Sequence, residues 1–244
     1  MNKNFLSLKT LPAYWMWKPS LYNNKELELS FLSVKKFAPW VTEYYVLSTI
    51  NPEIDGLTWV PIEPVEGGTD KHLFHTINNN LDKLPDYWLY MNDDFYFIDH
   101  MNIDEFYLPY AYGINVRERG SMGRGNGFAK CLWDTMEYVR EKYDCYVNFC
   151  SHCPFIMDKS VFISRINDWH MIERVQFETW LFAETNVEWR PAGSVRSMWI
   201  HTPPNKECIY NSINNSGYKL LAHDDYALEH GNTYLLDFLE EIVE

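Results

Sequence analysis

The sequence predicts an α/β fold with a Rossmann-like, mostly parallel central sheet flanked by helices. Strand and helix patterns alternate over roughly the first 95 of the 244 residues, which is typical of parallel strands joined by helical crossovers. Two adjacent carboxylates, Asp93 and Asp94, follow a buried strand, at the edge where such sheets bind ligands. Hydrophobic residues make up 46% of the chain, enough to form a substantial core and to exclude disorder.

Three short apolar runs predict the first strands. "AYWMW" at 13–17 ends at Lys18-Pro19, "EYYVLST" occupies 43–49, and "LTWVPIE" at 57–63 follows the turn-rich "NPEIDG". A fourth run, "YWLYM" at 87–91, leads directly into Asn92, Asp93 and Asp94.

Amphipathic spacing predicts the helices. The first helix runs from Asn24 to the stop at Pro39, and the second covers 70–83. In the first helix the expected apolar positions are Leu27, Leu29, Phe31, Leu32, Val34 and Phe37, opposite a polar face at Lys25, Glu28, Ser33 and Lys36. In the second they are Leu73, Phe74, Ile77 and Leu81. Further helices are expected at about 130–143, 173–184 and 233–243.

We expect one domain over residues 1–244, with a core at about 11–165, a C-terminal elaboration at about 166–244, and long loops. No apolar run of membrane-spanning length and no signal-peptide pattern occurs, so we expect a cytoplasmic protein without an integral membrane segment. Five cysteines favour reduced thiols. The Cys150–Cys153 pair lacks the second ligand pair of a zinc site, so we expect two buried structural thiols, with a redox pair as the alternative.

Charge and aromatic content limit the classes of partner. A net charge of −13 argues against a broad nucleic-acid surface, although a local basic groove is compatible with it. The 10 Trp, 17 Tyr and 14 Phe exceed the need of a plain core, so some are expected to line a cleft for ring-shaped ligands.

The Asp93-Asp94 pair predicts a site for a hard divalent cation. Mg²⁺ or Mn²⁺ binds one or two carboxylates together with phosphate oxygens and water, and can neutralise a diphosphate leaving group. Asp94 is a candidate catalytic residue as well as a ligand, and Asn92 is expected to contact the substrate or its phosphates. The alternative is a solvated strand-to-turn junction, because Asn and Asp favour turns.

A basic loop is the expected phosphate partner. Residues 113–128 hold five glycines and three arginines, Arg117, Arg119 and Arg124, inside an acidic protein. Guanidinium groups match phosphate geometry, and glycine lets backbone amides approach an anion closely. The alternative is a surface loop whose arginines only add solubility.

Three further residues are candidates for chemistry at this edge. His152, in "NFCSHCPF", is a general acid or base or a metal ligand, or else a hydrogen-bonded core histidine. His201, after "MWI", is a third metal ligand arriving late in the chain. Glu178, in "QFETWLF", is a candidate base with a raised pKa, or else a residue that caps the helix or pairs with Arg174.

Several segments, in the right order over roughly residues 11–165, resemble the Stealth proteins. That family contains sugar-phosphate transferases, including capsule polymerases and the lysosomal-enzyme GlcNAc-phosphotransferase. The similar segments are "AYWMWKPS", "ELELSFLSVKKFAPWVTEYYVLST", "FHTINNNLDKLPDYWLYMNDDFYF" and "SHCPFIMDKSVF". The second and third of these carry the specific part of the likeness, E-L-x-x-S-L-R-S-x-x-x-x-A-P-W and Y-x-N-D-D. Lys18-Pro19 departs from the Asp-Gly usual in the family, and no clear fourth region is found.

The resemblance implies a GT-A-like fold, with a metal motif at the end of a central strand. It implies that Asp93 and Asp94 correspond to carboxylates tied to metal and activity, and that His152 corresponds to the functional histidine. An arginine of the 117–124 loop corresponds to a basic site residue, without a secure alignment.

The expected function is transfer of a glycosyl group from a nucleotide-sugar donor to an acceptor hydroxyl, dependent on Mn²⁺ or Mg²⁺. The acceptor is a carbohydrate or another hydroxyl compound, with a modified nucleobase or nucleic acid as a minor alternative. One alternative function is Stealth-type sugar-1-phosphate transfer; another is a non-catalytic carbohydrate- or nucleotide-binding module.

Overall fold

The computed structural model describes residues 7–19, 24–65, 68–114, 127–172, 175–192, 197–200, 207, 210–211, 217–223 and 234–244. Its centre is a five-stranded sheet of order β3-β2-β1-β4-β9. The strands are β1 (Leu11–Met16), β2 (Val41–Ser48), β3 (Thr58–Pro61), β4 (Tyr87–Met91) and β9 (Phe155–Asp158). The first four are parallel, and β9 runs antiparallel to β4, with Tyr90 opposite Phe155 and Tyr87 opposite Asp158. This mixed, mostly parallel sheet confirms the predicted α/β class.

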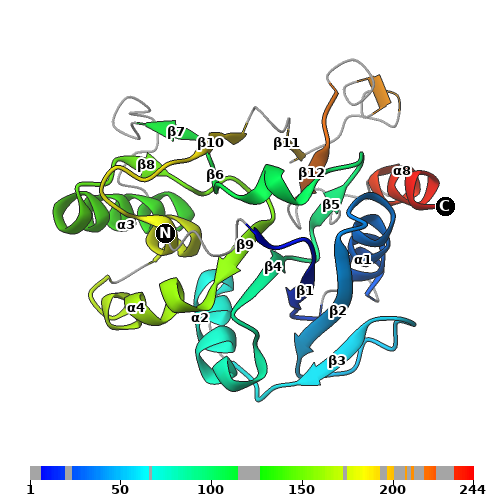
Figure 1. Ribbon diagram of the computed structural model, residues 1–244, viewed down its shortest axis with the longest axis horizontal. Helices are drawn as coiled ribbons and strands as arrows, with labels where there is room; N and C mark the ends of the chain where they lie inside the picture. Colours follow the sequence, from blue (N-terminus) through cyan, green and yellow to red (C-terminus); the bar gives the residue numbers. More distant parts are fainter. Residues whose placement is uncertain are drawn as a thin grey trace.

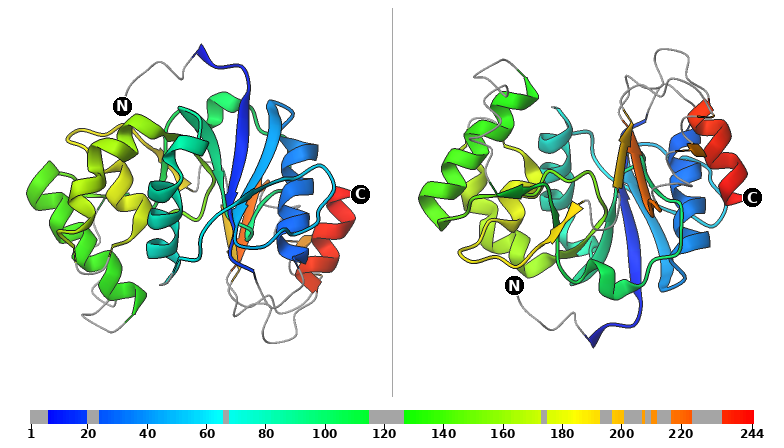
Figure 2. Two further views of the ribbon diagram at one scale, coloured as in Figure 1. Left: turned by 90° about the horizontal axis from the view of Figure 1, so that it is seen from below. Right: turned by 90° about the horizontal axis from the view of Figure 1, so that it is seen from above.

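Helices cover both faces of the sheet. They are α1 (Lys25–Phe37), α2 (Thr69–Asn79), α3 (Phe128–Tyr143), α4 (Lys159–Trp169), α5 (Phe177–Phe182) and α8 (Tyr234–Val243), with short 3-10 turns η2 (Leu81–Lys83) and η3 (Ile103–Phe106). Figure 1 gives their order along the chain, and Figure 2 shows three layers, with α1 and α8 on one face and α2, α3, α4 and α5 on the other.

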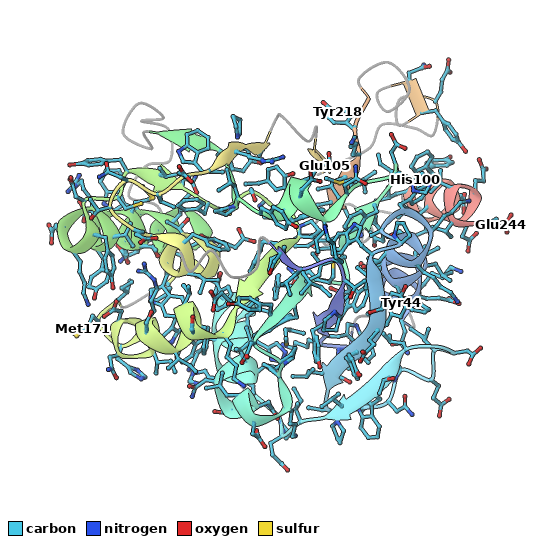
Figure 3. The ribbon with its side chains drawn as sticks, in the orientation of Figure 1. Tyr44, His100, Glu105, Met171, Tyr218 and Glu244 are labelled. Carbon is cyan, nitrogen blue, oxygen red and sulfur yellow. The ribbon has the colours of Figure 1, made fainter. Side chains whose placement is uncertain are left out.

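Smaller sheets extend the edge where β4 ends. The strands β5 (Phe95–Phe97), β12 (Leu220–His223) and β11 (Ser197–Ile200) form one; β6 (Tyr110–Ala111) pairs with β10 (Arg190–Pro191), and β7 (Gly113–Ile114) with β8 (Val147–Asn148). Glu105 of η3 and Tyr218, just before β12, lie near each other at the top of Figure 3, where Lys219 Nζ meets Glu105 Oε1 at 2.9 Å.

The hydrophobic core is continuous from β1 to β12 and is rich in aromatic side chains. In the α5 layer, the rings of Phe74 and Trp169 stack at a centroid distance of 4.1 Å, and Trp180 packs edge-on against both. A second apolar cluster joins α1 to β5, β12 and α8 through Leu29, Tyr96, Leu221 and Phe238. Among the helices that the structure describes, none is long and apolar enough to cross a membrane.

Two expectations about the elements are wrong. The helix expected at 173–184 is α5, which begins only at Phe177 and ends at Phe182, because Gln176 caps it by accepting a hydrogen bond from Thr179 N and Ala183 leaves the helical conformation. Ser33, expected on the polar face of α1, is fully buried, because its hydroxyl binds backbone groups rather than water.

Candidate functional site

The candidate site starts at the turn between β4 and β5. Strand β4 is an inner strand between β1 and β9, so the turn emerges inside the sheet edge at which the parallel strands end, and not at a free side of the sheet. Asn92, Asp93 and Asp94 are each half-buried, between Met91 and Phe95, which are buried. A hydrogen bond from Phe95 N to Asn92 O, at 3.3 Å, closes the turn. The two carboxylates therefore lie at a partly enclosed edge and not on an open surface.

Helix α1 holds this turn from behind. The Ser30 hydroxyl lies 3.2 Å from Asn92 O and 2.7 Å from Phe95 O, and it accepts a hydrogen bond from Trp15 Nε1 at 2.9 Å. Ser33 Oγ accepts from Phe97 N at 3.1 Å. The backbone of the turn and of β5 is therefore fixed by two buried serines, one helical turn apart on the same face of α1.

A second buried network continues from α1 to the C-terminal part of the chain. His223 Nε2 of β12 lies 2.9 Å from the Tyr96 hydroxyl and 3.5 Å from Glu26 Oε1. All three side chains are buried, and the rings of Tyr96 and His223 stack at 5.5 Å. Since Tyr96 is two residues from Asp94, this network connects β12 to the segment that carries the carboxylates.

Tyr90 of β4 belongs to the part of the site on the other face of the central sheet, away from α1. Its ring is buried against Phe155, and its hydroxyl donates a hydrogen bond to Asn92 Oδ1. Burial raises the Tyr90 pKa well above its usual value, and nearby negative charges raise it further. Those charges belong to four carboxylates, Glu178, Asp94, Asp70 and Asp93. The raised pKa of Tyr90 therefore indicates that several carboxylates lie close together at the edge of the sheet where β4 ends.

Glu178, the candidate base, lies on α5 and is buried. Burial raises the pKa of its carboxyl group from 4.5 to about 8, and the negative charge of Asp70 adds to the rise. Its Oε2 accepts a hydrogen bond from Ser151 N at 3.2 Å and a longer one, 3.5 Å, from Gln176 Nε2. At neutral pH Glu178 is therefore mostly a neutral acid. Arg174, its alternative partner, lies outside the described residues.

Asp70 is the residue of this site that the sequence did not single out. It lies in the first turn of α2, where its Oδ1 accepts a hydrogen bond from Phe177 N at 2.8 Å and thereby ties α2 to the start of α5. Burial raises its pKa to about 6. The position of Asp70 in the sequence could have identified it. A carboxylate in the first turn of the helix that follows the third parallel strand must lie at the edge of the sheet where the parallel strands end.

His152 reaches the same edge because β9 is antiparallel to β4. The segment 150–154 precedes Phe155, which pairs with Tyr90 at the carboxyl end of β4. His152 has a φ of 50°, a left-handed conformation that costs about 1–3 kcal/mol for a residue other than glycine. Its Nε2 lies 3.7 Å from Cys150 Sγ, and burial raises the pKa of the Cys150 thiol well above its usual value. Such local strain is typical of residues held for function.

The remaining predictions fall partly outside the described residues. Arg117, Arg119, Arg124 and His201 belong to this group. The segments on both sides of the arginine loop are described, however. Before the loop, β7 pairs with β8, which leads to Cys150. After the loop, Cys131 of α3 lies close enough to Cys150 to add to the rise of the Cys150 pKa. The described cysteines, Cys131, Cys145, Cys150 and Cys153, form no disulfide bond with one another.

The oxygen atoms of the aspartate turn suit a hard cation whose remaining ligands come from a bound substrate and water. Among the residues that the structure describes, no group of three or more His, Cys, Asp or Glu side chains is arranged to hold a metal ion by itself. Asp93 and Asp94 offer carboxylate oxygens, whereas Asn92 already uses its side-chain oxygen for Tyr90. Two carboxylates completed by phosphate and water oxygens are the usual protein contribution to a Mg²⁺–nucleotide site.

The site thus combines a carboxylate turn, a strained histidine and two carboxyl groups with raised pKa values, the buried Glu178 and the half-buried Asp70. These groups can bind a cation, exchange protons and bind a hydroxylated or phosphorylated ligand. Neither a scan against protein-family models nor a search of curated proteins finds a match to this chain.

Proposed function

We propose that this protein is a metal-dependent transferase with a GT-A-like fold that moves a glycosyl group from a nucleotide-sugar donor to an acceptor hydroxyl. The observation that carries the proposal is the convergence of Asp93 and Asp94, at the carboxyl end of an inner parallel strand, with His152 and Glu178. The motif resemblance to the Stealth proteins, which includes both aspartates and His152, supports the same class of chemistry.

Asp93 and Asp94 are the residues that would hold Mn²⁺ or Mg²⁺. When bound, such an ion neutralises the diphosphate of the donor as it becomes the leaving group. The serines of α1 keep the backbone of the aspartate turn rigid, so that the carboxylates are already oriented before the donor binds. The arginine loop begins and ends beside this edge and is the proposed source of further positive charge for the phosphates.

His152 is the proposed proton acceptor for the attacking hydroxyl. Glu178 is mostly protonated at neutral pH because of its pKa of about 8, so it is poorly suited to remove a proton there. As a neutral acid it instead holds the Ser151 amide, next to His152, through its Oε2. Glu178 thus has a positioning role, and a role as proton acceptor only at alkaline pH.

Transfer of sugar-1-phosphate is the second candidate. Of the motif residues shared with the Stealth pattern, Ser30 and Ser33 bind backbone groups of β5, and Glu26 lies beside His223 of β12, next to that strand. This placement favours the idea that the likeness extends to the reacting centre. In that case the acceptor hydroxyl attacks the β-phosphorus rather than the anomeric carbon.

A panel of sugar nucleotides with Mn²⁺, Mg²⁺ or EDTA tests these functions, with the released nucleotide identified by chromatography. Metal-dependent release of a nucleoside diphosphate supports glycosyl transfer, and release of a nucleoside monophosphate supports sugar-phosphate transfer. Asp94→Asn should abolish release, whereas the exposed Asp99→Asn, which makes the same chemical change nearby, should not. Tight binding of sugar nucleotides without release from any of them would instead indicate a binding module.

A further inference from the structure

We propose that the side-chain amide of Asn92 donates a hydrogen bond to an oxygen of the diphosphate of the nucleotide sugar, and that Tyr90 is the positioning residue that turns the amide nitrogen toward this ligand. The inference rests on the proposed function, because it names a phosphate contact of that same site. The alternative is that Asn92 joins Asp93 and Asp94 as a third ligand of the metal ion, through its side-chain oxygen. The two roles differ in which atom of the amide faces the ligand.

The side-chain oxygen of Asn92 is bound to a buried tyrosine. The Tyr90 hydroxyl donates a hydrogen bond to Asn92 Oδ1. Tyr90 itself is fixed, because its side chain is 1% exposed and its ring stacks on that of Phe155 at 4.5 Å. Since a carboxamide is planar and its oxygen and nitrogen point in different directions, a bond that holds Oδ1 against Tyr90 turns Nδ2 away from it.

The single proton of the Tyr90 hydroxyl selects this orientation of the amide. Burial and the neighbouring carboxylates raise the Tyr90 pKa well above its usual value, so the hydroxyl keeps its proton. Asn92 Oδ1 is the acceptor that this proton has among the described residues. If the amide were reversed, Nδ2 would face the hydroxyl, and the buried proton would have no acceptor.

The side-chain nitrogen of Asn92 is available to a ligand. Within the part of the chain that the structure describes, Nδ2 makes no hydrogen bond. Asn92 is half-buried, and its Nδ2 is an accessible atom and not an enclosed one. An amide nitrogen carries two donor protons and accepts none, so it can bind an oxygen atom but cannot coordinate a cation.

The neighbours of Asn92 favour a phosphate oxygen that arrives together with a cation. Asp93 and Asp94 follow directly in the same turn, which the bond from Phe95 N to Asn92 O closes at 3.3 Å. These carboxylates repel a bare phosphate, and a divalent ion removes the repulsion. The uncharged amide adds a donor beside the ion without competing with the carboxylates for it. Asn92 therefore suits an oxygen of a metal-bound diphosphate.

Isothermal titration calorimetry with two probes, Mg²⁺ alone and inorganic pyrophosphate at saturating Mg²⁺, separates the two roles of Asn92. We expect Asn92→Ala to weaken pyrophosphate binding by at least about tenfold, because it removes a donor to a charged acceptor. The Mg²⁺ affinity of this variant should stay within about twofold of the wild-type value, since the oxygen is not a metal ligand. Asn79→Ala, the same change at the exposed end of α2, should alter neither affinity.

Tyr90→Phe removes only the hydroxyl and lets the amide reverse. It should weaken pyrophosphate binding by about threefold to tenfold and leave the Mg²⁺ affinity unchanged. In the Asn92→Ala background the same change should have no further effect on pyrophosphate affinity, because Tyr90 acts through the amide. A purely structural role of Tyr90 would lower the melting temperature without this coupling between the two residues.

Unchanged pyrophosphate affinity in Asn92→Ala, or equal effects of Tyr90→Phe in both backgrounds, would overturn the proposal. A loss of Mg²⁺ affinity of about tenfold or more in Asn92→Ala would also overturn it, by making Asn92 a metal ligand, as would the absence of pyrophosphate binding to the wild-type protein. The test needs no turnover, so its outcome is separate from that of the transferase reaction. Pyrophosphate binding that depends on Asn92, in a protein that releases no nucleotide, would support the phosphate contact and contradict the transfer.

Discussion

The polar groups that lie on the two faces of the central sheet differ in their hydrogen bonds and in their pKa values. On the α1 face, Ser30 and Ser33 bind backbone groups of the 92–97 segment, and His223 lies within 3.5 Å of both Tyr96 and Glu26. On the α5 face, Asp70 and Glu178 are held by few hydrogen bonds, and burial raises their pKa values to about 6 and about 8.

The polar groups on the two faces therefore have different roles: those on the α1 face stabilise the structure, and those on the α5 face can exchange protons. Hydroxyl groups bonded to backbone atoms stabilise one geometry and have no proton to exchange near neutral pH. Buried carboxyl groups whose ionised form is disfavoured lower the stability at neutral or alkaline pH and titrate where enzymes work. The carboxylates Asp93 and Asp94 lie between the two faces, held by the first and electrostatically coupled to the second.

The largest effect is expected at the turn itself. Asp94→Asn should lower nucleotide release by at least about 100-fold, because changes at residues that merely orient metal ligands already cost 10–100-fold. Its free energy of unfolding should change little, since the residue is half-buried at a turn. Steady-state kinetics and urea unfolding would check both parts. Unchanged release would place the chemistry elsewhere.

The next effect tests the α5 face. In Glu178 the pKa of the folded state, about 8, lies above the ordinary value of 4.5, so the folded protein binds the proton more tightly and stability falls as the pH rises from about 4.5 to 8. Glu178→Gln should therefore raise the free energy of unfolding by up to about 4 kcal/mol at pH 8 and by nearly nothing below pH 4.5.

Urea unfolding of the wild-type protein and Glu178→Gln at several pH values measures this difference. Glu184→Gln, an exposed glutamate two residues beyond α5, is the matched control and should show no such slope. A difference that does not depend on pH would show that folding leaves the pKa of Glu178 unchanged.

A substitution on the α1 face should lower the free energy of unfolding by an amount that does not depend on pH. Ser30→Ala removes the hydroxyl that contacts Asn92 O and Phe95 O, and it leaves Trp15 Nε1 buried without its acceptor. The expected loss is about 2 kcal/mol of unfolding free energy. Ser164→Ala, on the exposed side of α4, should cost less than about 0.5 kcal/mol. Equal losses in the two variants would contradict the supporting role.

The smallest effect is expected in the His223 network. Tyr96→Phe removes the hydroxyl that lies 2.9 Å from His223 Nε2 and should cost about 1 kcal/mol in urea unfolding. Tyr146→Phe, at a tyrosine that is 50% exposed, provides the control without a buried partner. If Tyr96→Phe also lowers nucleotide release more than its stability loss explains, the network positions the aspartates as well as stabilising them.

Much of the parallel sheet could be predicted because each strand and crossover helix has a local pattern. The run "YWLYM" coincides with β4, and the apolar spacing of α1 and α2 marks their buried faces. Asp93 and Asp94 were placed at the strand end by the same local reasoning. Glu178 stood out as a single carboxylate in an apolar segment, which is how a buried group with a raised pKa looks in sequence.

What could not be predicted depends on contacts distant in sequence. The antiparallel direction of β9 is set by its pairing with β4, about 65 residues earlier, and no local pattern encodes it. Ser33 was misplaced because a buried serine and an exposed one look alike until the backbone amide of Phe97 is brought beside it. Asp70 and His223 were missed for the same reason, since their partners lie more than 100 residues away.

The position of β9 also determines when, during synthesis, the central sheet becomes complete. Strands β1 to β4 and the aspartate turn are made within the first 97 residues, but His152 follows more than 50 residues later and Glu178 later still. A growing chain therefore carries the two aspartates for some time with neither His152 nor Glu178 beside them. The edge of β4 that β9 will occupy stays open during that interval, and an open strand edge is where non-native strand pairing begins.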